Sequence, residues 1–260
     1  MSKYKSIHTG AVIDQAVTDV SFIADKFPNN AGAHNSIFRG KFLGNTYTSE
    51  QKAAIDAGTF EDLYIGDYWT MAGVNYRIAA FNYYYNTGDV ALTDNHATII
   101  PDTILYDHEM NDTDITIGAY AGSKMRTEGL DSAKTVIEAA FGAANVLTHR
   151  NFLHNAVTSG YTSGGAWYDA KVELMTELNV YGAKMYSNAT QGTNIANNIF
   201  VDKTQFPIFA LNPQSINIRA NYWLRDVASA SAFALVDLSG HASIPGASFV
   251  SGVRPAFSIS

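Results

Sequence analysis

The chain of 260 residues is 47% hydrophobic and only 16% charged, with a formal net charge of −7 at pH 7. This acidic balance argues against nucleic acid as a main partner, and the lack of cysteine excludes disulfide bonds, thiolate catalysis and Cys-rich zinc sites. The low charge predicts a surface rich in Asn, Thr, Ser and Tyr, which suits contact with proteins or with neutral polar ligands such as glycans.

The first residues, MSKYKSIHTGAVID, are polar and lack the apolar run of a signal peptide. No stretch of the sequence reaches the length and apolarity that a bilayer span requires, so no membrane insertion is expected. We therefore expect the protein to be made and assembled in a cytoplasm.

Residues 10–27 predict a helix with one apolar stripe. Its apolar positions follow the 4-3-4-3 spacing of a coiled-coil seam, and they are Ile13, Val17, Val20, Ala24 and Phe27. Two interpretations stay open: an amphipathic helix that lies on its own domain, or a short helix for oligomerisation or anchoring. The following segment, PNNAG at 28–32, predicts a linker.

A second, short helix is predicted over 52–57, with Thr48 as N-cap, Gln51 as its capping-box partner and Gly58 as the C-terminal stop. From residue 63 the alternation of apolar and polar residues predicts strands, with a hairpin turn at 71–74 and a second turn at 86–89. A further strand is predicted over 96–100.

Two longer helices are predicted next, over 130–147 and 172–185, from their apolar faces. Strands are then predicted in FPIFALNP (206–213), YWLRDV (222–227), AFALVDLSGHASIPG (232–246, with a turn at Ser239-Gly240) and RPAFSIS (254–260). Helices between an early and a late group of strands indicate an α+β fold in which both halves of the chain contribute to one sheet system.

Three groups of residues have the composition of a chemical site, and each has a simpler interpretation. His149 and His154 are five residues apart, which does not suit a shared metal on one helix face. Glu173 and Glu177 are four apart and are expected on one exposed helical face rather than as the acid pair of a glycosidase. The oxygen-rich segment 111–114 is expected to be a solvated turn rather than a calcium loop. We therefore expect no catalytic residue, metal or cofactor.

Aromatic residues are concentrated between residues 64 and 85, where core packing is their default role. The run Tyr83-Tyr84-Tyr85 cannot face one side of a strand, so at least one ring is expected to point outward. Exposed Tyr beside Asn is typical of recognition surfaces. The predicted ligand surface consists of Tyr84, Tyr85, Asn86, Asn221 and Tyr222.

The C-terminal segments YWLRDV, AFALVDLSGHASIPG and GVRPAF resemble the signature of a family of phage and prophage virion proteins with a C-type-lectin-like domain. The matching positions are Trp223, Leu224, Arg225, Val236, Gly240, Gly252, Val253, Arg254, Pro255 and Ala256. The segment IGDYWTMAGVNYRIAAFNYYYNTGD is similar to the hairpin that opens such domains, and IHTGAVIDQAV is similar to an N-terminal helix of virion-attached fibres.

This resemblance implies a C-type-lectin-like domain with inserted helices over 59–260, preceded by a helical anchor or oligomerisation segment over 1–58. Enzymes of this fold use active-site cysteines, which the chain lacks, and calcium-dependent lectins use EPN or QPD and WND motifs, which do not occur in it. What remains is a calcium-free fold that serves as a rigid display platform.

The implied function is that of a non-enzymatic bacteriophage virion protein: a head fibre, capsid decoration or tail-tip adhesin. Such a protein is expected to be a homotrimer on the virion, in contact with other virion proteins and, as an adhesin, with a glycan or protein of a host or mucosal surface. Two alternatives stay open: a virion-carried glycan depolymerase, and an architectural decoration protein that only stabilises the shell.

Trp223, Arg225, Arg254 and Pro255 are expected to be structural. The two arginines lie in apolar contexts, so each is expected to pair with an acid or to donate to carbonyl oxygens in the core. Pro255 is expected at the edge of a sheet, where its missing N–H costs no ladder hydrogen bond.

Overall fold

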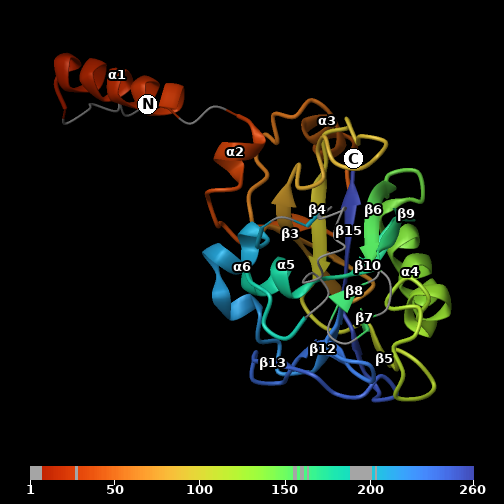
Figure 1. Cartoon of the computed structure of the whole chain (residues 1–260). Helices are drawn as coiled ribbons and strands as arrows, with labels where there is room; N and C mark the ends of the chain where they lie inside the picture. The colour runs from red at the N-terminus through yellow and green to blue at the C-terminus, as the bar shows by residue number, and fades with distance from the viewer. Residues whose placement is uncertain are drawn as a thin grey trace.

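The computed structural model describes residues 8–26, 29–154, 157–158, 161–162, 164–187, 201–202 and 204–260. The chain is α+β, with helices and strands mixed along the sequence and several sheets (Figure 1). The class predicted from the sequence is confirmed at this level. No helix within the described ranges combines the length and apolarity needed to cross a membrane.

Within the described part of the chain, six strands form the largest sheet, in the order β1-β2-β3-β4-β15-β10. They are β1 (Phe42–Gly44), β2 (Tyr68–Met71), β3 (Val74–Phe81), β4 (Ala97–Pro101), β15 (Pro255–Ile259) and β10 (Val172–Leu174). The β2–β3 hairpin closes through Ala72 and Gly73, which have φ angles of 49° and 81°. Two successive positive φ angles are what a tight two-residue hairpin turn requires, and the predicted turn at 71–74 is confirmed.

The C-terminal strand β15 lies inside this sheet, not at its edge. It pairs antiparallel with β4 on one side and with β10 on the other, and Phe257 is opposite both Ile99 and Val172. The predicted edge position of Pro255 is therefore wrong. Pro255 is tolerated because it is the first residue of β15 and is opposite Leu174 at the end of the short strand β10.

A second sheet has the order β13-β12-β11-β14-β5 among the described strands. These are β13 (Ala242–Ser243), β12 (Phe233–Val236), β11 (Tyr222–Val227), β14 (Ser251–Val253) and β5 (Tyr106–His108). Because Arg254 alone separates β14 from β15, the C-terminal segment passes directly from the second sheet into the first. The N–H of Arg225 on β11 also donates to the carbonyl of Met175 after β10, at 2.9 Å.

Two antiparallel two-stranded sheets complete the described strands: β6 (His149–His154) with β9 (Gly165–Ala170), and β7 (Val157–Thr158) with β8 (Tyr161–Thr162). The helices are α1 (Gly10–Lys26), α2 (Ala31–His34), α3 (Ser49–Asp56), α4 (Asp131–Phe141), α5 (Glu177–Tyr181) and α6 (Pro207–Leu211). A π-helical turn, η1 (Met125–Gly129), precedes α4, and a 3-10 turn, η2 (Pro213–Ser215), follows α6.

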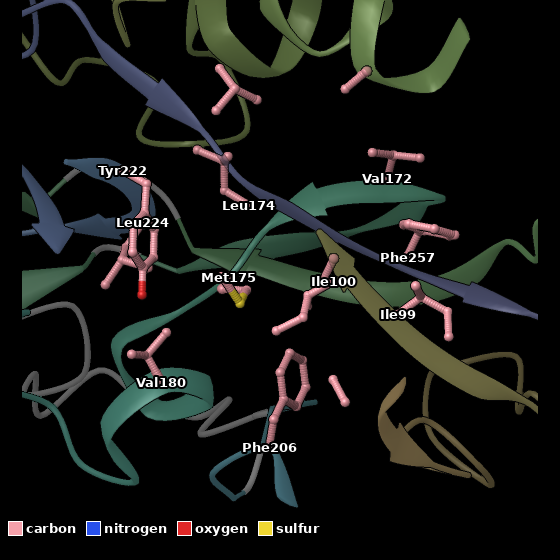
Figure 2. Packing of buried hydrophobic residues seen from close by; sticks show 14 of the residues in the cluster. Ile99, Ile100, Val172, Leu174, Met175, Val180, Phe206, Tyr222, Leu224 and Phe257 are labelled. Atoms are coloured by element: carbon pink, nitrogen blue, oxygen red, sulfur yellow. The ribbon is translucent and has the colours of Figure 1, made fainter. Parts of the chain in front are cut away.

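The core lies between the sheets and the helices that cover them (Figure 2). Ile99 and Phe257 of the large sheet, Leu224 of the second sheet and Val180 of α5 all belong to this one cluster. Trp69 and Trp223, one from each sheet, are fully buried. Burial of apolar side chains from both sheets in one cluster is the main term that holds the two sheets together.

Three predicted elements differ from the structure. The helix predicted over 130–147 ends at Phe141, because Gly142 adopts a φ of 87° that terminates it. The helix predicted over 172–185 is instead strand β10 followed by the short helix α5. The strand predicted over 206–213 is helix α6 with Pro207 at its first turn, a position that favours helix initiation.

Candidate functional site

Helix α1 confirms the predicted N-terminal helix, and its apolar stripe is open to solvent. The side chains of residues 8–21 are all exposed, and Ile13, Val17 and Val20 expose 44%, 60% and 66% of their surface. In Figure 1 the helix lies away from both sheets. This overturns the interpretation in which the helix lies on its own domain. Phe27, and the side chain of Ala24, lie outside what the structure describes.

The five residues of the predicted ligand surface are not brought together. Tyr84 and Tyr222 are buried, so both are wrong as surface residues. The Tyr84 hydroxyl donates to Asp202 at 3.2 Å, and the Tyr222 hydroxyl donates to the Ile216 carbonyl at 3.0 Å. Burial of these rings is stabilised by hydrogen bonds of their hydroxyl groups.

Tyr85 and Asn86 are exposed in the turn after β3. Asn221 lies just before β11 in the second sheet, where its carbonyl accepts the Gly252 N–H at 3.2 Å. The outward ring expected from the tyrosine run is therefore Tyr85. Two exposed residues on one turn are too small a set to define a binding site by themselves.

Glu173 and Glu177 do not share an exposed helical face; both are buried. Glu173 on β10 accepts the Tyr120 hydroxyl at 2.6 Å and the Arg126 Nε at 3.2 Å. Glu177 at the start of α5 accepts backbone N–H groups of residues 185–187 at 2.9 to 3.0 Å. Each carboxylate is occupied by donors of the chain itself, which is typical of structural acids.

Arg225 on β11 and Asp202 form a buried ion pair. Tyr84 and Asn179 also donate to the Asp202 carboxylate, at 3.2 Å each. The ring of His149 stacks on Tyr84 with centroids 3.8 Å apart. Burial, with the nearby positive charge of Arg225 second, lowers the pKa of His149 to about 3, so the ring is neutral at pH 7.

Arg254 lies where the two sheets meet and has a different kind of partner. Its Nε donates to the Pro101 carbonyl at 2.9 Å and its Nη1 to the Ser215 carbonyl at 3.1 Å. Its guanidinium also lies over the Tyr222 ring, 4.9 Å from the centroid. Arg225 thus pairs with an acid, and Arg254 donates to carbonyl oxygens. Trp223 and Pro255 are buried as well.

The oxygen-rich segment 111–114 is engaged with protein donors. Asp112 accepts the Lys124 ammonium at 2.5 Å, and Asp114 accepts the Ser248 N–H and hydroxyl at 2.9 and 2.7 Å. His149 and His154 lie at opposite ends of β6. Across the described ranges, no three His, Cys, Asp or Glu side chains are grouped in a way that would hold a metal ion.

A hollow of about 460 Å³ is the best candidate for a binding site, and we call it the Phe38 hollow. Its lining combines one aromatic ring, three cations, one acid and four neutral polar side chains. They are Phe38, Arg39, Arg77, Arg254, Asp102, Asn212, Gln214, Ser215 and Asn217, together with Gly40 and Ile218. The hollow lies beside the large sheet, against the turn that follows α6.

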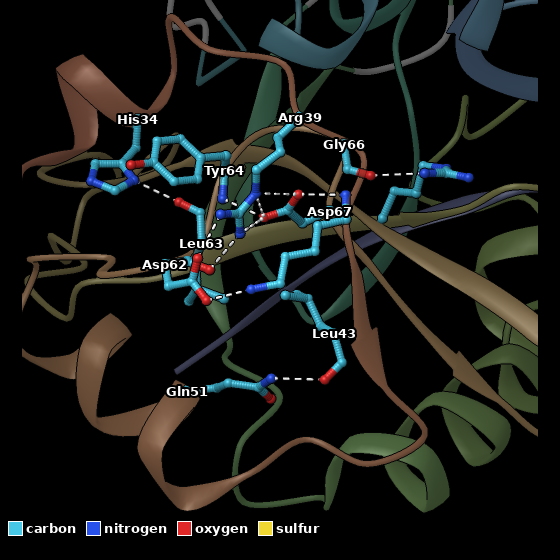
Figure 3. Close-up of polar contacts among 11 residues, drawn as sticks. His34, Arg39, Leu43, Gln51, Asp62, Leu63, Tyr64, Gly66 and Asp67 are labelled. Carbon is cyan, nitrogen blue, oxygen red and sulfur yellow. Dashed lines mark hydrogen bonds and ion pairs between the residues drawn. The ribbon is translucent and has the colours of Figure 1, made fainter. Parts of the chain in front are cut away.

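Arg39, one of the three arginines that line the hollow, is held in place by two acids (Figure 3). Arg39 binds the fully buried Asp67 through Nη2 at 2.6 Å and the exposed Asp62 through Nη1 at 2.5 Å. Asp67 also accepts the N–H groups of Lys41 and Tyr64, at 2.7 and 2.8 Å. These bonds fix the backbone on both sides of Arg39, and with it the position of the preceding residue, Phe38.

Phe38 itself presents a fixed, partly open ring. It exposes 39% of its surface and packs on Gly66, where an added Cβ would come within 2.2 Å of a ring carbon. Gly66 has a φ of 84°, and its carbonyl accepts the Arg77 Nη1 at 2.8 Å. Arg77 in turn binds Asp102 at 2.6 Å. A flat apolar ring beside amides and guanidinium groups suits binding of a sugar ring rather than acid–base chemistry.

A second hollow, of about 400 Å³, contains Glu50, Glu61 and Asp62 in its lining. The pKa of Asp62 is lowered by its bonds to Lys41 and Arg39, and that of Glu50 is lowered by hydrogen bonds at the start of α3. Both carboxylates are therefore held ionised. A glycosidase needs one carboxyl with a raised pKa to protonate the leaving group, and these two acids have the opposite shift.

Sequence reasoning missed the Phe38 hollow, although two local signals were present. Phe38 precedes an Arg-Gly pair, and the turn over 212–217 is rich in Asn, Gln and Ser. The strand predicted over 206–213 overlaps this turn, so the sequence did not indicate a polar loop there.

Comparisons of the chain with protein-family models, with curated proteins and with solved structures find no match.

Proposed function

We propose that this chain is a non-enzymatic structural protein of a bacteriophage virion. In this proposal α1 joins copies of the chain into a homotrimer and attaches them to other virion proteins. The rest of the chain is a C-type-lectin-like domain, displayed as a head fibre, capsid decoration or tail-tip adhesin. The observation that carries the proposal is the exposed apolar stripe on a helix that stands away from the sheets.

The helix needs a partner on physical grounds. A helix of 17 residues is marginal in water without tertiary packing, and α1 leaves its apolar stripe open. In the heptad, Val17 takes an a position, and Ile13 and Val20 take d positions. β-branched residues at both a and d favour three or four strands over two. A parallel bundle of copies of α1 would bury this stripe.

The display domain is supported by the positions of the resemblance residues. Trp223 and Arg225 lie on β11, and Arg254 joins β14 to β15, whose first residue is Pro255, so these four signature residues lie where the two sheets meet. Their partners there are structural ones. A signature made of such residues marks a shared fold rather than a shared reaction.

The two alternatives have less support. A depolymerase requires a raised-pKa acid opposite a second carboxylate in an open site. In the second hollow the pKa values of Glu50 and Asp62 are lowered, and Asp226, whose pKa is raised, lines neither hollow. A purely architectural protein would share the α1 assembly but would have no use for a rigid hollow lined by Phe38, amides and arginines. The Phe38 hollow therefore favours the adhesin branch of the proposal.

The assembly is tested by light scattering of the wild-type chain and of a Val17→Asp/Val20→Asp variant. We expect a trimer for the wild type and a folded monomer for the variant, because charges on the stripe cannot be buried between helices. The matched control is Thr18→Asp, which adds a charge off the stripe and should stay trimeric. A wild type that is monomeric, or a double variant that stays trimeric, contradicts the proposed assembly.

The virion location is tested separately, by quantitative mass spectrometry of purified particles from the lysate of the phage that carries this gene. We expect the chain in the particle at a copy number divisible by three. Its absence from particles would contradict the proposal.

A further inference from the structure

The Phe38 hollow contains a buried positive charge that the described chain does not balance. Arg254 exposes 1% of its surface. Two of its five N–H groups donate to backbone carbonyl oxygens, and no carboxylate of the described residues forms an ion pair with it. Asp102, the acid of the hollow, is held by Arg77 at 2.6 Å. A buried cation without a counter-charge favours an anionic group beside it.

The rest of the lining is suited to a sugar ring. Phe38 offers a rigid apolar plane that its packing on Gly66 holds in place. Asn212, Gln214, Ser215 and Asn217 supply amide and hydroxyl groups that bind sugar hydroxyls. A fixed aromatic plane with neutral polar groups around it binds one face of a pyranose at a low cost in side-chain entropy.

We propose that the Phe38 hollow binds a sugar residue that carries a carboxylate, with the carboxylate directed at the guanidinium group of Arg254. A planar carboxylate matches the planar donor fork of a guanidinium, which gives the pair its geometric specificity. This inference rests on the proposed display function and deepens it, because it names the ligand class of the displayed domain.

Matched pairs of small glycans test the charge requirement. The probes are 3′-sialyllactose against lactose, and trigalacturonate against galactotriose, titrated calorimetrically into the full chain. We expect the acidic member of at least one pair to bind about tenfold more tightly than its neutral partner, as one charge-assisted bond predicts. Equal binding within both pairs, or binding to neither acidic member, overturns the inference. Binding of a ribitol phosphate oligomer without either acidic glycan also overturns it.

Charge variants at the rim identify the hollow without disturbing the core. Gln214 is exposed, so Gln214→Glu and Gln214→Lys should both fold. We expect Gln214→Glu to weaken and Gln214→Lys to strengthen binding of the acidic glycan, each by about fivefold, as one surface charge at short range predicts. The matched controls are Thr135→Glu and Thr135→Lys on α4, no residue of which lines the hollow. The same change at both positions would overturn the assignment of the site.

The role of the Phe38 ring in binding is tested by a separate substitution. Phe38→Ala should lower affinity for the acidic glycan about tenfold, because the stacking surface is lost. Phe249→Ala is the control, since Phe249 is exposed to a similar extent and does not line the hollow. An unchanged affinity for Phe38→Ala overturns the site. The glycan titrations use different measurements from the trimer and particle experiments, so failure of the sugar site can be distinguished from failure of the proposed function.

Discussion

The buried carboxylates of the described residues are each surrounded by hydrogen-bond donors that the fold holds in place. Asp67 is fully buried and accepts bonds from Arg39 and from two backbone N–H groups. Glu177 is fully buried and accepts backbone N–H groups of residues 185–187. Such donors replace the water that a carboxylate loses on burial. Removal of one partner should therefore cost more stability than removal of a whole pair.

The ion pair between Arg225 and Asp202 tests this rule. Arg225→Met should lower the free energy of unfolding by about 3 to 5 kcal/mol, because it leaves the Asp202 charge buried and unbalanced. The double variant Arg225→Met/Asp202→Leu should recover part of that loss. Urea unfolding curves measure both. A double variant whose loss of stability equals the sum of the losses of Arg225→Met alone and Asp202→Leu alone would contradict this account.

His149 predicts a dependence of stability on acid. Its pKa of about 3 lies below that of an unfolded histidine, so the unfolded state binds a proton that the native state refuses. This contribution to stability is full above about pH 6.5 and falls as the pH drops from there toward 3. His149→Phe should make the fall in the free energy of unfolding between about pH 6.5 and pH 3 smaller. The exposed His241→Gln should leave this fall unchanged.

His149→Phe should also raise stability at pH 7. Neither ring nitrogen of His149 has a hydrogen-bond partner among the described residues, although both are buried. Replacement by Phe keeps the stacking on Tyr84 and removes two unsatisfied polar atoms, for a gain of about 1 kcal/mol. Thermal unfolding at pH 7 measures this change; a lower midpoint for His149→Phe would show that the nitrogens are satisfied.

The raised pKa of Asp226 predicts the opposite dependence of stability on pH, with stability lost as the pH rises. Burial, and then the charge of Glu177, raise the pKa of Asp226 to about 7, so the native state holds a proton that the unfolded state releases. This contribution is full below about pH 4 and is lost as the pH rises toward 7. Asp226→Asn should remove that loss and raise stability at pH 8. The exposed Asp107→Asn serves as the control, and equal effects of the two variants would contradict the prediction.

At the scale of elements, α3 shows how a local signal acquires a tertiary role. The predicted capping box is present: Thr48 accepts the Gln51 N–H at 3.3 Å, and Gln51 accepts the Thr48 N–H at 3.0 Å. The Gln51 side chain also accepts the Trp69 Nε1 at 2.9 Å and donates to the Leu43 carbonyl at 3.1 Å. One side chain thus caps the helix and links it to β1 and β2.

The two halves of this capping box should therefore differ in their contribution to stability. Thr48→Ala removes a cap and should cost about 1 kcal/mol. Gln51→Ala should cost about 1 to 3 kcal/mol more, because it also leaves the indole N–H of the buried Trp69 without its partner. Urea unfolding of both variants measures the difference, and equal losses would show that the Gln51 contacts with the sheet add nothing.

The elements that the sequence predicted well are those whose signals are local. The α3 cap, the turn through Ala72 and Gly73 and the strand at 222–227 depend on neighbouring residues and were confirmed. The helix predicted over 172–185 failed because Val172 and Leu174 pair with β15, about 80 residues further along the chain. A short apolar run does not by itself reveal whether a strand partner exists elsewhere.

At the scale of the whole molecule, α1 and the rest of the chain should be separable. Removal of residues 1–28 should leave a folded monomer, since the side chains of residues 8–21 are exposed. If the wild type is a trimer, its thermal midpoint should rise with protein concentration, and that of the truncated chain should not. Scanning calorimetry at several concentrations measures both. A truncated chain that fails to fold would show that α1 stabilises the sheets.

The sequence alone determined the α+β class, the lack of cysteine chemistry, the capped helix and the helix with an apolar stripe, because composition and short spacings define these features. Only the tertiary structure decided that β15 lies inside the sheet and that Tyr84 and Tyr222 are buried. It also decided that Arg254, Phe38 and the 212–217 turn line one hollow. These outcomes depend on which distant segments pair, and that choice is set by burial of apolar surface across the whole chain rather than by any local pattern.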